Sequence, residues 1–184
     1  ITSKQLIKRS SKDINVIKAE KFAKSLGVDA YYDDNIKIAE IVNKVLNNLN
    51  SKNYKLPPQI MVKNYFQCLL SRKYNLADFD MKSPQRVLLN VKNFNKFNVN
   101  DERIMKTIYH EIGHYLHFIK CNDIYFLLEQ SNFKPDIADI ISKNIRPYAA
   151  NSPLEFVADV FAEKMMGKNH NNELINLYEF LGGP

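Results

Sequence analysis

The feature that most constrains this chain is an apolar helical stretch with three polar groups set into it. Residues 110–114 read His110-Glu111-Ile112-Gly113-His114. The surrounding apolar positions are Ile104, Met105, Ile108, Ile112, Tyr115, Leu116 and Ile119. Apolar residues at this spacing predict a helix that packs into a protein core. Burying two imidazoles and a carboxylate on such a helix is costly unless they bind something, so the fold has to form around a polar site.

The residues of this motif are spaced for a metal ion. His110 and His114 are four residues apart, so on a helix both imidazoles project from one face and can reach the same Zn²⁺. Glu111 lies between them, where a carboxylate that is not a ligand can take a proton from a water bound to the metal. Gly113 costs about 1 kcal/mol in a helix interior, which predicts a close neighbour at that point. The motif predicts a zinc site with Glu111 as general base, and satisfied core polar groups are the alternative.

A zinc enzyme also needs a third protein ligand and an open fourth position. His117 is about 10 Å along the helix axis from His110, so we predict that it is a core residue or supports a ligand. His170 lies in a polar Asn-rich stretch and is predicted to be in a surface loop. Neither histidine is therefore predicted to be the third ligand.

The better candidate is Glu155, on a second apolar helix that begins near Pro153. Asp159 is four residues further along the same face, and Ala158 between them permits close approach of two helices. We predict that Glu155 is the third ligand and that Asp159 accepts a hydrogen bond from a ligand imidazole. A surface acid or a helix salt bridge is the alternative for Asp159, and Glu163 is predicted to be exposed to solvent.

Composition limits the other classes of protein. The 184 residues suit one domain, or one domain with a helical extension, and two cysteines do not make a disulfide framework. The net charge is +6, but the basic residues are scattered and no nucleic-acid motif is present. No apolar run approaches the roughly 20 residues of a membrane span, and the start of the chain has no signal-peptide pattern. We expect neither nucleic-acid binding nor a membrane span. Cys68, within an apolar run, is predicted to be a buried free thiol.

Local patterns predict a mostly helical α+β protein with a few short strands. The predicted helices cover about 14–26, 33–49, 100–120, 123–130, 135–144, 153–166 and 172–181. The predicted strands cover 59–62, 76–81 and 86–91. Asp33 or Asp34 is the predicted cap of the second helix, and Asn100 of the helix that carries the motif. We predict an N-terminal helical region, 1–56, packed on a catalytic domain, 57–184.

These residues resemble a known family. The His-Glu-Ile-Gly-His motif, followed by Glu155 on a second helix, resembles the gluzincin zinc metallopeptidases. Tyr148 precedes Glu155 by seven residues, an arrangement similar to the catalytic domain of the anthrax lethal factor group and the related secreted Pro-Pro endopeptidases of clostridia. The likeness covers roughly 57–166. Asp159 stands where that group commonly has Glu, and the Glu-x-x-Ala-Asp form is also similar to other gluzincins.

The resemblance implies a zincin-like fold, mostly helical with a small, twisted mixed sheet and the motif on its active-site helix. It also implies a zinc-dependent endopeptidase and a role for Tyr148 in stabilising the oxyanion or donating a proton. It also implies that an extended substrate pairs with an edge strand, for which Arg86 to Val91 is the candidate. We expect a monomer, and secretion is slightly favoured over the cytoplasm. Two alternatives remain open. One is a zincin-fold protein used structurally in a phage particle or toxin assembly. The other is a helical binding module in which the metal only stabilises the fold.

Overall fold

The structure is a computed structural model that describes residues 13–63, 76–83 and 85–184. The elements of its first half are α1 (Ile14–Ser25), β1 (Asp29–Tyr31), α2 (Ile36–Ser51), β2 (Gln59–Lys63), β3 (Ala77–Asp80), β4 (Arg86–Asn90) and α3 (Val91–Lys96). Those of the second half are α4 (Asp101–Lys120), α5 (Asn122–Glu129), α6 (Pro135–Asn144), the short 3-10 helix η2 (Pro147–Asn151), α7 (Pro153–Met165) and α8 (Asn172–Phe180). The prediction of a mostly helical α+β protein with a small mixed sheet is confirmed.

The four described strands form one sheet in the order β1-β2-β4-β3. β1, β2 and β4 run parallel, and β3 pairs with β4 in the antiparallel direction. The prediction that residues 86–91 form the edge strand is therefore wrong. Both sides of β4 are occupied by hydrogen-bonded neighbours, because β2 and β3 pair with it over almost its full length. β3 is the edge strand on that side of the described sheet.

Side-chain caps fix where the long helices begin. The side chain of Asn35, rather than that of Asp33 or Asp34, accepts from a backbone N–H in the first turn of α2. Asp33 and Asp34 have φ angles of +43° and +55°, so they form the turn that precedes the helix. Asn100 caps α4 as predicted, by accepting from the backbone N–H of Arg103.

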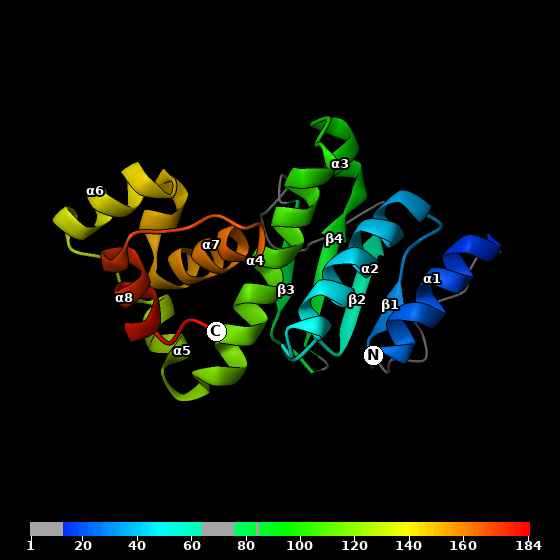
Figure 1. The fold of residues 1–184 in the computed structure, drawn as a ribbon, viewed down its shortest axis with the longest axis horizontal. Helices are drawn as coiled ribbons and strands as arrows, with labels where there is room; N and C mark the ends of the chain where they lie inside the picture. The colour runs from blue at the N-terminus through cyan, green and yellow to red at the C-terminus, as the bar shows by residue number, and fades with distance from the viewer. Residues whose placement is uncertain (1–12, 64–75, 84) are drawn as a thin grey trace.

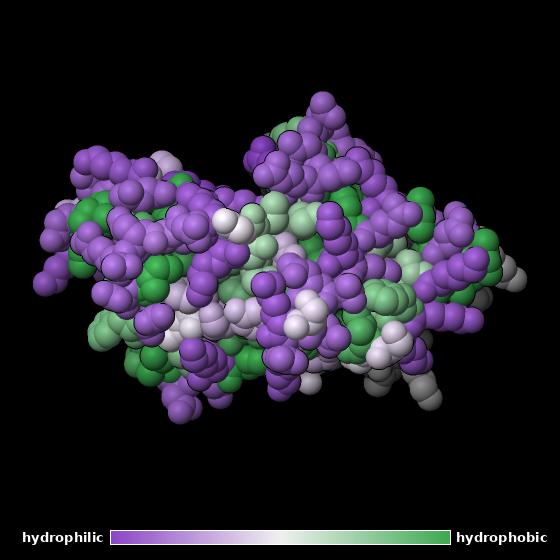
Figure 2. Space-filling view, viewed as in Figure 1, coloured by the Kyte–Doolittle hydropathy of each residue, from purple (hydrophilic) through white to green (hydrophobic). Residues whose placement is uncertain are grey.

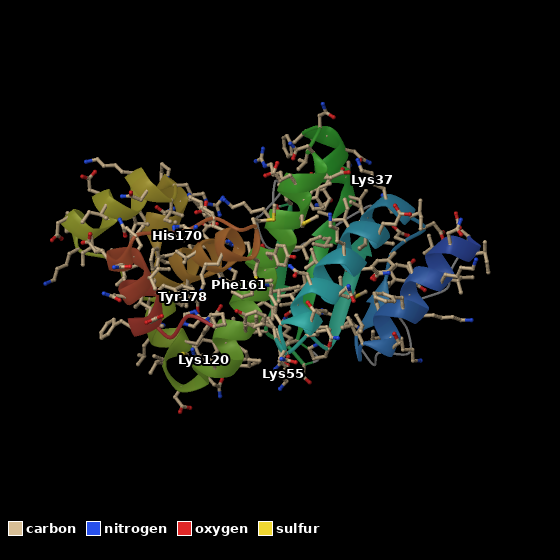
Figure 3. The ribbon with its side chains drawn as sticks, in the orientation of Figure 1. Lys37, Lys55, Lys120, Phe161, His170 and Tyr178 are labelled. Carbon is tan, nitrogen blue, oxygen red and sulfur yellow. The ribbon has the colours of Figure 1, made fainter. Side chains whose placement is uncertain are left out.

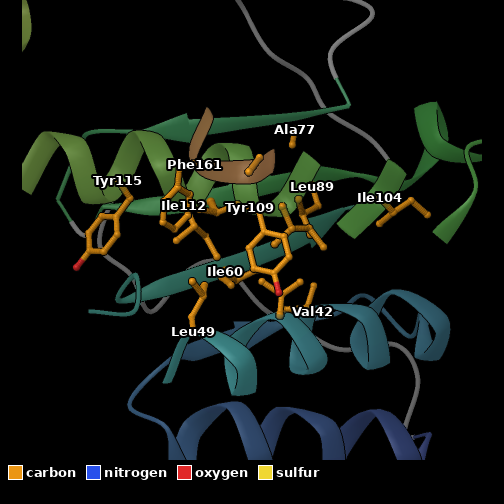
Figure 4. Close-up of a cluster of buried hydrophobic side chains, with 14 of the residues drawn as sticks. Val42, Leu49, Ile60, Ala77, Leu89, Ile104, Tyr109, Ile112, Tyr115 and Phe161 are labelled. Atoms are coloured by element: carbon orange, nitrogen blue, oxygen red, sulfur yellow. The ribbon is translucent and has the colours of Figure 1, made fainter. Parts of the chain in front are cut away.

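Helices α2 and α4 lie side by side over the sheet, and the main core lies between them and the strands (Figure 1, Figure 4). Val42 and Leu49 of α2 meet Ile60 of β2 and Ile112 of α4 in this core. Asn48 also donates a 2.7 Å hydrogen bond to the Tyr109 hydroxyl. This packing buries one face of α4 and leaves another face for α7.

On the side of α4 away from α2, helices α5 to α8 form the second half of the molecule (Figure 1). A Cβ built on Gly113 would lie 3.2 Å from the Cα of Ala158 and 3.1 Å from the ring of Phe161. The absence of a side chain at Gly113 thus permits the close contact between α4 and α7. The predicted close neighbour of Gly113 is a helix, and the prediction for Ala158 is confirmed.

Polar side chains cover most of the face seen in Figure 2, and apolar ones form smaller groups among them. In the described part of the chain, no helix combines the length and apolarity needed to cross a bilayer. Cys68 lies outside the described residues. Residues on both sides of position 56 contribute to one sheet, since β1 pairs with β2, and the division of the chain at that position stays a prediction.

Candidate metal centre

Three predicted ligand side chains converge where α4 meets α7. The Nε2 atoms of His110 and His114 are 3.1 Å apart. Carboxylate oxygens of Glu155 lie 3.2 Å from Nε2 of His110 and 3.7 Å from Nε2 of His114. One atom from each residue can be chosen so that all three lie within 4.8 Å of one another. This group could hold a metal ion.

The donor set also fits a tetrahedral ion by size. Zinc–ligand bonds of about 2.0–2.1 Å place neighbouring ligand atoms roughly 3.3–3.4 Å apart. The two Nε2 atoms are 3.1 Å apart, and each faces its own Glu155 oxygen, Oε2 at 3.2 Å from His110 and Oε1 at 3.7 Å from His114. In addition, Oε2 of Glu155 is buried, and it lies against Nε2 of His110. A carboxylate whose two oxygens face two imidazole nitrogens away from water requires a cation or a proton.

The charge balance of the cluster points the same way. Burial by itself lowers the pKa of His110, but hydrogen bonds to Asp159 and Glu155 outweigh it and raise that pKa to about 10. Burial raises the pKa of Glu155, and the two imidazoles more than offset this, so the pKa lies well below its ordinary value. A proton on His110 thus balances the neighbouring carboxylates, and a metal cation can take the place of that proton.

Asp159 orients the first histidine. Its Oδ1 atom lies 3.1 Å from Nδ1 of His110. An ionised carboxylate only accepts, so Nδ1 carries the hydrogen and the Nε2 lone pair is free to face a metal. Asp159 is 1% exposed, and Arg146 binds it with a two-pronged contact of 2.5 and 2.6 Å. The structure places Asp159 where the sequence analysis expected it.

The second histidine has a different support. The hydroxyl of Tyr125, on α5, lies 3.4 Å from Nδ1 of His114. Tyr125 is buried, and burial raises the pKa of its hydroxyl far above the ordinary value, so the group stays neutral. The sequence analysis missed both Tyr125 and Arg146. Neither has a fixed offset from the motif, and only the packing of α5 and the loop before η2 brings them to the site.

Glu111 lies beside the three ligand candidates and is also buried. Burial raises its pKa, and the carboxylates of Asp78 and Glu155 add to the rise, although His110 and His114 act in the opposite direction. A carboxylate with a raised pKa is a better proton acceptor than an exposed one. The position and environment of Glu111 therefore suit a general base.

A cavity of about 940 Å³ opens over these residues. Its walls come from β3, α4, α5 and the segment from η2 into α7. Tyr148 lines the cavity and is 48% exposed, with the guanidinium of Arg146 5.1 Å from its ring centre. Tyr148 is thus in the same cavity as the three ligand candidates.

The remaining predictions for polar residues fare differently. His117 is fully buried and its Nε2 lies 2.8 Å from the carbonyl oxygen of Leu181, so its prediction as a core residue is confirmed. Glu163 is buried, which corrects the prediction of an exposed acid: Lys106 and Lys168 form ion pairs with it at 2.7 and 2.6 Å. The side chain of His170 is 2% exposed beside Glu163, so it is not a surface side chain either.

Comparison of the chain with protein-family models, with curated proteins and with solved structures found no match.

Proposed function

We propose that this protein is a zinc-dependent endopeptidase of the gluzincin type. The observation that carries the proposal is the convergence of His110, His114 and Glu155 on one point of the cavity, with Glu111 beside them. Two helices far apart in sequence supply these groups. Both helices bury their polar residues in apolar surroundings, where such residues are costly without a ligand.

Zinc held by the three side chains would supply a Lewis acid that acidifies a water and polarises the scissile carbonyl. The chain's own residues do the rest. Glu111 accepts a proton from the attacking water and delivers it to the amine that leaves. The hydroxyl of Tyr148 donates a hydrogen bond to the oxygen on which negative charge develops. The resemblance to the lethal factor group supports this role for Tyr148, as does its place in the cavity wall.

A peptide substrate would bind in an extended conformation along β3 rather than along residues 86–91. Residues 77–79 and 81 line the cavity, and β3 has one hydrogen-bonding edge that no described strand occupies. Backbone pairing with such an edge accommodates many sequences, while side chains of the substrate reach into the cavity. This arrangement favours an endopeptidase.

The first test examines zinc binding and the role of Glu111 as general base in the same protein. We expect one zinc per chain after reconstitution, and cleavage of members of a peptide library. Glu111→Gln should retain zinc and fold but lower kcat by about 100- to 10,000-fold, since an amide cannot accept the proton. Glu102→Gln is the matched control, because it removes the same charge from the exposed first turn of α4.

The results separate the proposal from its alternatives. Chelation that abolishes cleavage without unfolding the protein supports the enzyme, whereas unfolding on chelation supports a metal that only stabilises the fold. Stoichiometric zinc without any cleavage favours a structural zincin-fold protein. A Glu111→Gln variant that cleaves at the wild-type rate would disprove the mechanism.

A further inference from the structure

One side chain contacts both the support of a ligand candidate and the predicted oxyanion residue. The guanidinium of Arg146 binds Asp159 through two nitrogens: Nε lies 2.5 Å from Oδ2, and Nη2 lies 2.6 Å from Oδ1. The same guanidinium lies over the ring of Tyr148, with its carbon 5.1 Å from the ring centre. Arg146 is 43% exposed and lines the cavity, whereas Asp159 is buried.

We propose that Arg146 is a positioning residue: it holds Asp159 in the orientation that aligns His110, and it holds the Tyr148 ring at the cavity wall. The part that concerns Tyr148 rests on the proposed peptidase function. The part that concerns His110 requires only that the site binds zinc.

One oxygen of the Asp159 carboxylate serves both Arg146 and His110. Oδ1 of Asp159 accepts hydrogen bonds from both Nη2 of Arg146 and Nδ1 of His110. The fork of Arg146 occupies both carboxylate oxygens and therefore fixes the plane of the carboxylate. With that plane fixed, only one direction remains for the hydrogen bond from His110, and the direction in which Nε2 points follows from it.

The backbone at Arg146 also restricts where its side chain can lie. Arg146 is fully extended, with φ −172° and ψ +159°, and it precedes Pro147. A following proline favours this extended conformation, so the path of the chain into η2 is restricted before the side chain makes any contact. The proline also separates Arg146 from Tyr148 by one residue. The guanidinium can consequently contact the Tyr148 ring and Asp159 of α7 at the same time.

The proposed role requires an arginine and not merely a positive charge. A lysine at this position would retain the charge but offer a single point of contact, without a planar fork or a flat face for stacking. If the role were only to neutralise a buried acid, lysine would serve as well. The proposed role needs the geometry of the guanidinium, so the two readings predict different behaviour for Arg146→Lys.

The test measures zinc affinity by competition with a chromogenic chelator in Arg146→Gln, Arg146→Lys and the wild type. Lys143→Gln is the matched control, because it removes a positive charge from an exposed ion pair on the neighbouring α6. We expect the zinc dissociation constant to rise about 10- to 100-fold in Arg146→Gln. A smaller but clear rise is expected in Arg146→Lys, and no change in Lys143→Gln or Tyr148→Phe.

Circular dichroism and the melting temperature of the zinc-free protein establish that each variant is folded. If Arg146→Gln does not fold, Arg146→Lys carries the test. A folded Arg146→Lys with wild-type zinc affinity would show that only charge matters, and would overturn the link to His110. A folded Arg146→Gln whose zinc dissociation constant is within twofold of the wild-type value would also overturn that link, because neither the charge nor the fork would then be needed.

A double-mutant cycle at saturating zinc tests the link to Tyr148. We expect Arg146→Gln to lower kcat several-fold less in the Tyr148→Phe background than in the wild type, with KM little changed in both, because the two side chains act as one unit. An equal loss in both backgrounds would overturn this link. If the wild type binds zinc but cleaves no peptide, the proposed function fails, while the zinc measurements still decide the role of Arg146.

Discussion

Two buried acids on α7, one helical turn apart, are neutralised in different ways. Asp159 is bound by the two-pronged guanidinium of Arg146 and contacts His110. Glu163 is 5% exposed and meets the ammonium groups of Lys106 and Lys168 instead. His170 lies near Glu163 at 3.5 Å, and Figure 3 shows it beside α7.

The difference lies in what each acid holds in place. The carboxylate of Asp159 contacts a ligand candidate, so its orientation is transmitted to the cavity. The carboxylate of Glu163 joins Lys106 of α4 to the segment after α7, and among the described residues it contacts no ligand candidate. An ion cluster is therefore not evidence of a functional site by its charge alone. What counts is whether it fixes the direction of a group that faces the substrate.

The largest effect is expected from a change that disturbs both acids. Gly113→Val would place branched methyl groups against Phe161 and Ala158, where even a Cβ would lie 3.1–3.3 Å from its neighbours. Separating α4 from α7 draws His110 away from Asp159 and Lys106 away from Glu163. We expect a loss of unfolding free energy of roughly 1–3 kcal/mol from overpacking, together with weaker zinc binding. Urea denaturation measures the unfolding free energy, and competition with a chelator measures the zinc affinity.

Gly113→Ala provides the graded control. The added methyl gains about 1 kcal/mol of helix propensity, which offsets part of the contact strain, so its loss should be much smaller. A Gly113→Val variant with wild-type stability and wild-type zinc affinity would mean that the close contact between the helices is not what holds the two clusters together.

The next effect separates the two acids. Asp159→Asn should raise the zinc dissociation constant by about 10- to 100-fold, because an amide presented to His110 is a poorer acceptor. Glu163→Gln, which removes an equally buried charge from the same helix, should leave zinc affinity unchanged. Equal losses in the two variants would show that net charge, rather than contact with His110, determines affinity. Chelator competition on both proteins decides the matter.

The contacts of Asp159 also show which site residues can be predicted from the sequence and which cannot. The spacing of His110, Glu111 and His114 on one helix, and of Glu155 and Asp159 on another, is a local property of the helix. The predicted neighbours were therefore found together. The positions of Arg146 and Tyr125 depend on how a loop and a short helix pack against α7 and α4. Such contacts leave no periodic signal, and neither side chain was predicted.

The same distinction explains the errors in the sheet and at Glu163. The apolar run at 86–91 is a local signal, so it predicts a strand, and the structure has β4 there. The position of β4 inside the sheet, between β2 and β3, depends on the order of the strands. A local pattern does not contain that order. Glu163 was predicted to be exposed because acids usually are. Its burial depends on two lysines, one from 57 residues earlier in the chain and one from the loop that follows α7.

The smallest effect concerns stability and pH. Burial raises the pKa of Glu163, but Lys106 and Lys168 together outweigh it and hold that pKa below its ordinary value of 4.5. A carboxyl whose pKa is lowered on folding contributes stability above its unfolded pKa, and this contribution is lost as pH falls through the folded value. Glu163→Gln removes the contribution at any pH.

We therefore expect zinc-free Glu163→Gln to be less stable than the zinc-free wild type by roughly 1 kcal/mol at pH 7. The loss is modest because both lysines are partly exposed and regain water when the acid is removed. Below about pH 4.5 the difference should shrink, as the wild-type carboxyl takes up a proton. Urea denaturation from pH 7 down to pH 3 measures this directly. A difference that stays constant across this range would mean that Glu163 stabilises the protein by packing rather than by charge, and the two acids of α7 would then differ in kind as well as in position.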